Sequence, residues 1–384
     1  MRSPVHPDAK AEIVATTVRD PAVVDQFADG VRRFQWMGSP LYAEFCRHIL
    51  DDDDLLALAA AAPSGQPYTH LLFAAVQFLI LEDPGTPLAA YYGSVTQSPV
   101  RDPARAFVAF RDFCAERTGE IIAIMKKRTV QFTLAGRAAF VLPAIAYVAR
   151  LAGEPLSFID IGCSAGLLTS FARYAYDYGD GRRIGDPTAL TIDSFRFTGG
   201  PPAFLSHIPK IGRLVGIDLN PVDPADPKER RWIDALCPPD MAEERRQLRA
   251  ALDLRARTAL PVTRGDALAA LPDFLTSMPD PICALAAHCL YQWPADARAA
   301  LDAEFRKASD GRRLYFVTIE HPAALNASRT GHSFNKGGET APMEHEATVT
   351  VYRDGDATSM LLGRYDSFGR QGVWLAEDPR EIAA

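Results

Sequence analysis

Hydrophobic positions in the first 150 residues recur at helical spacing, with almost no strand pattern. In "SPLYAEFCRHIL", Leu41, Phe45 and Ile49 fall on one helical face, with Ser39 at the N-cap and Pro40 at the first helical position. The stretch "THLLFAAVQFLILE" is apolar nearly all round, which is typical of a helix buried among other helices. The pattern therefore predicts an α-helical N-terminal domain over residues 1–150.

From residue 151 onward the pattern changes to short apolar runs that alternate with helical stretches. This alternation indicates βαβ units and hence a mainly parallel sheet with helices on both faces. We expect one such α/β domain over residues 151–384, with an insert near residues 178–210. The strand-like runs cover residues 157–161, 214–217, 261–263, 282–287 and 314–319.

The C-terminal stretch "EATVTVYRDGDATSMLLGRYD" contains two strand-like runs around Asp354-Gly355, a strong hairpin signal. It predicts an antiparallel hairpin over residues 347–364 that forms an edge of the sheet. Residues 326–344, just before it, are rich in Gly, Ser, Asn and Thr and predict a long loop. Both a lid over a site and a plain surface loop fit this composition.

Composition narrows the class of protein. The 384 residues are 48% hydrophobic and 23% charged, as in soluble globular proteins. The net charge of −7, without a run of Lys or Arg, disfavours a nucleic-acid partner and favours a small-molecule one. The longest apolar stretch, residues 71–81, is about half the roughly 20 residues of a membrane span, so no membrane partner is expected.

The N-terminus lacks the apolar segment of an export signal, so we expect a cytoplasmic protein. Six cysteines are scattered without a C-x-x-C pair, which makes zinc sites and disulfides poor expectations and predicts buried thiols. Nothing in the sequence predicts the oligomeric state.

The first strand-like run of the second domain ends in an unusual turn. In "PLSFIDIGCSAGLLTSFARYAYDYGDG" the run leads to Asp160-x-Gly162-x-Ser164-x-Gly166 and then into a helix-like stretch. Glycines at a strand-to-helix turn let a ligand approach the backbone, and the helix N-terminus offers amide donors. A dinucleotide fingerprint fails here, because Ser164 and Leu167 stand where it needs glycines. Tight packing after a buried strand also accounts for small residues at this place.

Two more carboxylates follow strand-like runs. In "GRLVGIDLNP", Asp218 ends a continuous apolar run, where a carboxylate binds ribose hydroxyls in doubly wound folds. It lies 52 positions after Gly166, so an insertion must intervene, and Asp193 in "ALTIDSF" is the nearer rival at 27 positions. We favour Asp218 because its run is continuous and apolar like a buried parallel strand. The third carboxylate, Asp266 in "PVTRGDAL", can also be explained as a helix N-cap.

The pattern D-x-G-x-G-x-G, with Ser164 at the middle glycine, resembles the first motif of class I S-adenosylmethionine-dependent methyltransferases. The resemblance implies a Rossmann-like sheet and S-adenosylmethionine as cofactor. It places Gly162, Ser164 and Gly166 at the cofactor and Asp160 near its charged amino-acid part. It also implies that Asp266 contacts the adenine amino group.

Residues 34–374 also resemble the DUF2332 family of bacterial proteins, which is assigned a methyltransferase-like fold. Matching pieces include "SPLYAEF", "FIDIGCSAGLLTSFARYAYDYGDG", "GIDLNPVDPAD" and "HCLYQWP". Family members commonly have a Q-T-N-E-x-x-R segment. Here it reads "QFTLAGR", which keeps Gln131 and Arg137 but lacks the Asn and Glu.

Candidate groups for chemistry on a methyl acceptor follow the fourth and fifth strand-like runs. His288 and Tyr291 lie in "ALAAHCLYQWP", and Glu320 and His321 in "VTIEHPAAL", at the edge where open α/β sheets bind ligands. Methyl transfer from a sulfonium is an in-line displacement that needs alignment and, for a protonated acceptor, a base. His288 is the base candidate by its ordinary pKa, and Glu320 would position the acceptor. A core histidine packed beside Tyr291 is the alternative, and we expect no metal.

Two hypotheses follow for the function. The first is an S-adenosylmethionine-dependent methyltransferase that acts on an unidentified small molecule. The second is a catalytically silent protein of the same fold that binds the cofactor or has a regulatory role. Ser164 at a glycine position, the altered "QFTLAGR" and the absence of an N/D-P-P-Y motif keep the second hypothesis open as the alternative to the first.

Overall fold

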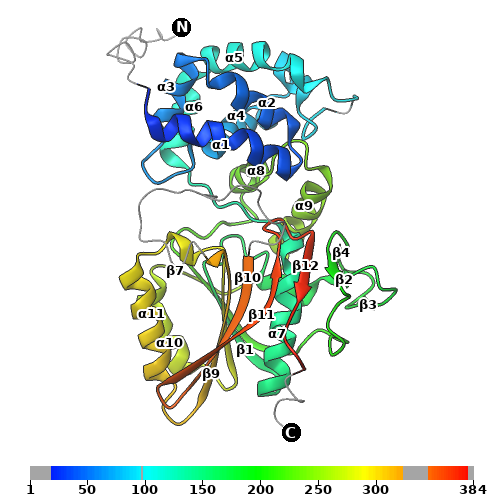
Figure 1. Cartoon of the computed structure of the whole chain (residues 1–384), viewed down its shortest axis with the longest axis vertical. Helices are drawn as coiled ribbons and strands as arrows, with labels where there is room; N and C mark the ends of the chain where they lie inside the picture. Colours follow the sequence, from blue (N-terminus) through cyan, green and yellow to red (C-terminus); the bar gives the residue numbers. More distant parts are fainter. Residues whose placement is uncertain (1–18, 97, 323–344, 379–384) are drawn as a thin grey trace. The chain divides into compact units, whose positions relative to one another are not determined.

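A computed structural model describes residues 19–96, 98–322 and 345–378 (Figure 1). The loop predicted over residues 326–344 lies outside them. The chain forms two compact units. The first consists of Met1–Phe132 with Pro227–Arg246, and the second of Thr133–Asp226 with Gln247–Ala384.

The first unit is helical, as the apolar periodicity predicts. Its central helix α4 (Tyr68–Glu82) is buried on nearly every side. Gln77 interrupts the apolar run of α4 because its side-chain amide donates to the carbonyls of Ala235 and Cys237, each at 2.7 Å. The helices around α4 are α1 (Pro21–Met37), α2 (Pro40–Ile49), α3 (Asp53–Ala60), α5 (Phe107–Glu116), α6 (Thr118–Lys127), α8 (Pro227–Leu236) and the start of α9 (Ala242–Ala256).

This division differs from the predicted boundary at residue 150. Helix α7 (Ala138–Ala152) belongs to the second unit, where it contacts the sheet. Helix α8 belongs to the first unit, where the Trp232 indole donates to the Thr129 carbonyl at 3.0 Å. Periodicity identifies both segments as helices, but it does not say which core each one packs against. Residues 135–152 are apolar and long enough to cross a membrane, yet 83% of them are buried, as in the core helix of a globular protein.

The second unit is built on a nine-stranded sheet, and its five predicted parallel strands are all present. They lie side by side in the order β7-β6-β1-β8-β9, the doubly wound arrangement of third, second, first, fourth and fifth strands. The chain order therefore reverses between β1 and β8. The strands are β1 (Leu156–Ile161), β6 (Ile211–Asp218), β7 (Val262–Arg264), β8 (Ile282–Ala287) and β9 (Arg313–Glu320).

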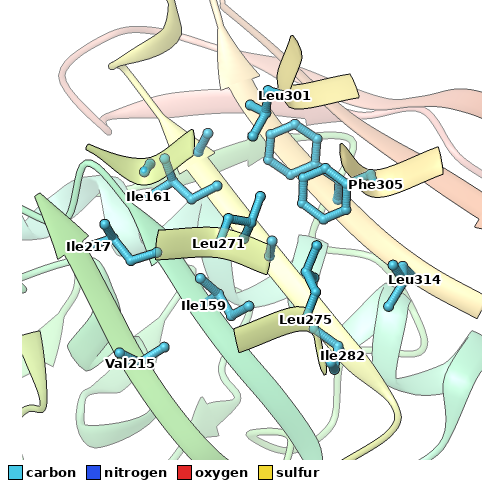
Figure 2. Packing of buried hydrophobic residues seen from close by; sticks show 14 of the residues in the cluster. Ile159, Ile161, Val215, Ile217, Leu271, Leu275, Ile282, Leu301, Phe305 and Leu314 are labelled. Atoms are coloured by element: carbon cyan, nitrogen blue, oxygen red, sulfur yellow. The ribbon is translucent and has the colours of Figure 1, made fainter. Parts of the chain in front are cut away.

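Alternation along β1 gives the sheet two different faces. Ile159 and Ile161 point into a cluster with Leu271 of α10 (Ala267–Ser277) and Phe305 of α11 (Ala295–Ala308) (Figure 2). Asp160, the residue between them, has the opposite orientation. The acidic residue of the turn therefore points away from the main apolar cluster.

The C-terminal hairpin is present, but it is not the edge of the sheet. Strands β10 (His345–Arg353) and β11 (Asp356–Tyr365) pair antiparallel around Asp354-Gly355, as predicted. Beyond β11 lie β12 (Gln371–Trp374) and then β5 (Arg196–Thr198), which forms the edge. The predicted edge position is therefore wrong. Strands of four and three residues are too short for their side-chain alternation to be recognised in a sequence.

The stretch after the glycine turn is not an α-helix. It forms only the short 3-10 helix η5 (Thr169–Arg173), followed by β2 (Ala175–Asp177) of a small sheet with β3 (Arg183–Ile184) and β4 (Thr191–Ile192). The hydroxyls of Tyr174 and Tyr176 donate to the carbonyls of Leu167 and Phe171 at 2.8 and 2.6 Å. These side chains occupy carbonyls that an α-helix would use for its own amides. The expected helix N-terminus is therefore absent from this described segment.

Candidate functional site

The turn after β1 depends on three residues with left-handed backbone. Gly162, Ser164 and Gly166 have φ values of 76°, 50° and 72°. A β-carbon on Gly162 would lie 2.7 Å from Cβ of Cys289, and one on Gly166 would lie 2.7 Å from Cδ2 of Leu260. Both glycines are therefore required by the packing of the chain itself. This is the packing alternative that the sequence leaves open.

Asp160 and Ser164 make different contributions to this turn. Asp160 is buried and accepts a hydrogen bond from the Thr169 hydroxyl, which ties β1 to η5. Burial raises the pKa of its carboxyl to about 7. Ser164 donates its backbone amide to Oδ2 of Asp218 at 2.8 Å. The Ser164 hydroxyl oxygen is buried and has no hydrogen-bond partner among the described residues.

Asp218 is the carboxylate beside the turn. Its Oδ2 accepts from Ser164, and its Oδ1 accepts from the amide of Asn220 at 2.7 Å. Asp193 instead follows β4 in the small sheet and accepts from the Gln247 side chain at 3.3 Å. The structure thus places Asp218, and not Asp193, at the turn. Leu219, the next residue along the chain, exposes 66% of its surface.

Asp266 follows β7 and is the N-cap of α10. Its carboxylate accepts from the Leu268 amide at 2.9 Å, and the residue is exposed. The N-cap interpretation that the sequence leaves open is therefore realised.

A second group of polar side chains lies where β8 and β9 end. His288 has a φ of 54°, and its Nε2 is 2.6 Å from the Tyr365 hydroxyl. Its ring centroid is 4.6 Å from that of His345, which in turn is 5.7 Å from that of His321. A non-glycine residue in left-handed backbone is strained, and such strain concentrates at functional sites. We call His288, Glu320, His345 and Tyr365 the strand-end cluster.

Glu320 is the carboxylic acid of the strand-end cluster and is deeply buried, with 2% exposure. Its Oε1 accepts from the amides of Cys289 and Leu290, each at 2.7 Å, whereas its Oε2 is buried and has no partner among the described residues. Burial raises the pKa of the carboxyl to about 8. The group is therefore mainly protonated at neutral pH, and the proton belongs on Oε2, because Oε1 already accepts two hydrogen bonds.

Arg137 supplies the positive charge of this region, and the sequence offered it only as a residue kept from a family segment. It ends the 3-10 helix η4 (Ala135–Arg137), is buried, and donates its Nε to the Ser367 carbonyl at 2.8 Å. Burial, and then the charge of Arg137, lower the pKa of His288 well below its ordinary value and that of His345 to about 3. Both imidazoles are therefore neutral at pH 7.

These findings change the roles expected of His288 and Tyr291. His288 was the base candidate by its ordinary pKa, but its lowered pKa and its contact with Tyr365 make it a weak base. Burial, together with Glu320, raises the pKa of Tyr291 to about 12, so its phenol is protonated. Among residues 19–96, 98–322 and 345–378, no group of three or more His, Cys, Asp and Glu side chains is arranged to hold a metal ion.

Cys289 joins the glycine turn to the strand-end cluster. Its side chain packs against Gly162, and its thiol donates to the Ile161 carbonyl at 3.2 Å. Its backbone amide donates to Glu320. One residue thus spans the point between β1 and β8 where the strand order reverses, which is where open α/β sheets bind ligands.

Comparisons with known proteins give one extensive match. The family described as "Uncharacterized protein conserved in bacteria (DUF2332)" matches residues 24–374. No curated protein matches the chain. Among solved structures, the CcbJ methyltransferase from Streptomyces caelestis is similar at 14% identity, over 65% of this chain and 76% of that one. The TM-score is 0.21, which is too low to support an argument about fold or function.

Proposed function

The chain belongs to the DUF2332 family, whose description assigns no activity. From the geometry of its site we propose that the protein is an S-adenosylmethionine-dependent methyltransferase that acts on a small molecule. The proposal covers the cofactor, the reaction class and the residues involved. It rests on the described part of the second unit alone.

The observation that carries the proposal is the arrangement of Asp218, Ser164 and Leu219 at the carboxyl end of β6. The Asp218 carboxylate retains lone pairs for ribose hydroxyls beyond the two amides that it already accepts. The buried Ser164 hydroxyl lacks a partner that a polar ligand would supply. Leu219 offers an exposed apolar surface for a base. A nucleoside needs these three features together, and they fit the cofactor.

Four of the predicted cofactor residues have roles in the fold that the prediction did not include. Gly162 and Gly166 make room for Cys289 and Leu260, so they shape the turn and do not themselves face the cofactor. Asp160 holds the turn through Thr169. Asp266 stabilises α10, so a contact with adenine would be additional to its N-cap role.

When bound, S-adenosylmethionine supplies an activated methyl group, and the chain has to align an acceptor with it. Cys289 places the strand-end cluster next to the turn, so the acceptor would lie against His288, Tyr291 and Glu320. The neutral His288 can take up a proton only weakly, which suits an acceptor that loses its proton easily. Protonated Glu320 would hold the acceptor as a hydrogen-bond donor.

The second candidate is a protein that binds the cofactor without catalysis. It is favoured by one observation, that neither His288 nor Glu320 is a ready base at neutral pH. The two candidates share the cofactor site, and they differ in whether labelled methyl groups from the cofactor appear on a small molecule. A screen of metabolite pools with labelled cofactor separates them.

The cofactor assignment is tested by calorimetry with S-adenosylmethionine and S-adenosylhomocysteine. We expect saturable binding that weakens about tenfold or more in Leu219→Asp, because burying a new carboxylate charge against the adenine ring is unfavourable. Leu375→Asp is the matched control, since Leu375 is also exposed, at 50%, and directly follows β12. The control should bind like the wild type. Absence of binding by the folded wild type, or binding of NAD instead, would reject the assignment.

A further inference from the structure

We propose that Tyr365 is a positioning residue that keeps the ring proton of His288 on Nδ1, so that His288 donates a hydrogen bond to the methyl acceptor and is not its base. The part of this inference that concerns the acceptor rests on the proposed function. The position of the ring proton is argued from the contacts of the two side chains alone.

The Tyr365 side chain is held in one position by its neighbours. It lies in β11 and exposes 1% of its surface. The Phe140 ring of α7 stacks on it, with 4.7 Å between the ring centroids and 16° between the planes. The His345 ring, its partner across the β10–β11 pair, lies 5.6 Å away. This packing places the Tyr365 hydroxyl 2.6 Å from Nε2 of His288.

The direction of this hydrogen bond follows from the number of donors and acceptors. A phenol has one O–H to donate, and a neutral imidazole has one N–H and one bare nitrogen. Among the described residues, Nε2 of His288 is the one hydrogen-bond partner of the Tyr365 hydroxyl. If Nε2 carried the ring proton, the buried hydroxyl would accept it and would leave its own hydrogen without a partner, which is unfavourable. Tyr365 therefore donates to a bare Nε2, and the ring proton of His288 lies on Nδ1.

The surroundings keep both groups in the protonation states that this argument needs. Burial, and then the charges of Arg137 and His345, lower the pKa of His288, so its ring is neutral at pH 7 and has one proton to place. Burial raises the pKa of the Tyr365 phenol well above its ordinary value, so the hydroxyl keeps its hydrogen.

A ring held in this form is suited to donate a hydrogen bond. Nε2 of His288 is occupied by Tyr365 and Nδ1 already carries a proton, while part of the His288 surface stays exposed. The Nδ1–H group can donate to an oxygen of the acceptor. The acceptor must then lose its proton to solvent before the methyl group is transferred. This favours an oxygen or sulfur atom that ionises near neutral pH and disfavours an alcohol.

The position of the proton is measured by ¹⁵N NMR on the full chain labelled in its histidine rings. Protonated and bare ring nitrogens have clearly different chemical shifts, and the signals of His288 are those that His288→Asn lacks. At pH 7 we expect a protonated Nδ1 and a bare Nε2. A proton on Nε2, or on both nitrogens, would overturn the proposal.

Tyr365→Phe identifies the residue responsible, because it keeps the packed ring and removes the hydroxyl. The ratio of the Nε2–H form of His288 to the Nδ1–H form should rise about fivefold or more, the worth of one hydrogen bond. Tyr147→Phe is the matched control, since it removes another buried phenol hydroxyl of the same unit, one that contacts Sδ of Met360. It should leave His288 as in the wild type. An unchanged ratio in folded Tyr365→Phe would contradict the role of Tyr365.

The donor role is tested in the screen with labelled cofactor. His288→Asn retains an N–H donor close to the place of Nδ1, and asparagine tolerates the left-handed backbone of this position. It should therefore keep most of the turnover, whereas His288→Ala should lose about tenfold or more, the worth of a hydrogen bond to a charged group. A His288→Asn variant as inactive as His288→Ala would show that His288 is the base.

The NMR and binding measurements separate this inference from the proposed function. If S-adenosylhomocysteine binds and the ring proton of His288 lies on Nε2, only the inference is rejected. If the ring proton lies on Nδ1 and S-adenosylhomocysteine does not bind, the effect of Tyr365 on His288 stands, and the methyltransferase proposal falls together with the acceptor.

Discussion

Asp160 shows at the scale of one residue how burial changes what a motif residue does. The sequence places it at a strand end, where the family resemblance gives an acidic residue near the cofactor. In the structure its carboxyl is buried, hydrogen bonded to Thr169, and has a pKa raised to about 7. A motif predicts that a carboxyl is present. It does not predict the protonation state, which depends on packing by residues distant in the sequence.

The pH dependence of stability tests this view of Asp160. Because its folded-state pKa of about 7 is above the ordinary 3.8, the folded protein keeps a proton that the unfolded chain releases. Stability contributed by that proton is complete below about pH 4 and is lost as the pH rises to about 7, by up to ~1.4 kcal/mol per pH unit. Asp160→Asn does not titrate, so chemical denaturation should show it gaining stability relative to the wild type across that range.

Glu320→Gln serves as the comparison for Asp160→Asn. The Glu320 carboxyl has a pKa of about 8. The stability of Glu320→Gln relative to the wild type should therefore keep rising to about pH 8, one unit higher than for Asp160→Asn. A difference between Asp160→Asn and the wild type that stays constant from pH 4 to pH 7 would show that the Asp160 carboxyl is ionised throughout.

The C-terminal hairpin shows at the scale of elements how much local sequence can specify. Asp354 and Gly355 have φ values of 52° and 83°, the left-handed pair that a two-residue hairpin turn requires. The turn dipeptide and the flanking alternation were enough to predict β10 and β11. The helix expected after the glycine turn does not form, because the hydroxyls of Tyr174 and Tyr176 occupy backbone carbonyls of that segment. Such contacts are not visible in hydrophobic periodicity.

Alanine substitutions at two glycines test the hairpin. Gly355→Ala should destabilise the second unit by about 1 kcal/mol or more, because alanine is strained at positive φ. Gly119→Ala is the control, since Gly119 lies inside α6 and a β-carbon there would meet no atom within 4 Å. The control should stabilise the first unit by about 0.5–1 kcal/mol. Thermal denaturation followed for each unit measures both, and a neutral Gly355→Ala would show that the turn adopts another conformation.

At the scale of the whole molecule, the sequence specifies the class of fold better than the assignment of segments to units. Five parallel strands, the hairpin and the N-terminal helices were predictable, because each has a clear period or turn signal. The membership of α7 and α8 was not, since a helix pattern does not identify its partner. The position of Asp218 beside the glycine turn was predictable because Asp218 ends a continuous apolar strand. Arg137 and His345 were missed as site residues because only the folded chain brings them beside His288.

The central claim is that a nucleoside cofactor binds at the turn after β1, beside the carboxyl end of β6. A crystal structure of the protein with S-adenosylhomocysteine at saturating concentration tests it most directly. We predict ribose hydroxyls within hydrogen-bond distance of the Asp218 carboxylate, a partner for the Ser164 hydroxyl, and the adenine ring against Leu219. Ligand bound at another place, or a turn without ligand at a saturating concentration, would contradict the account.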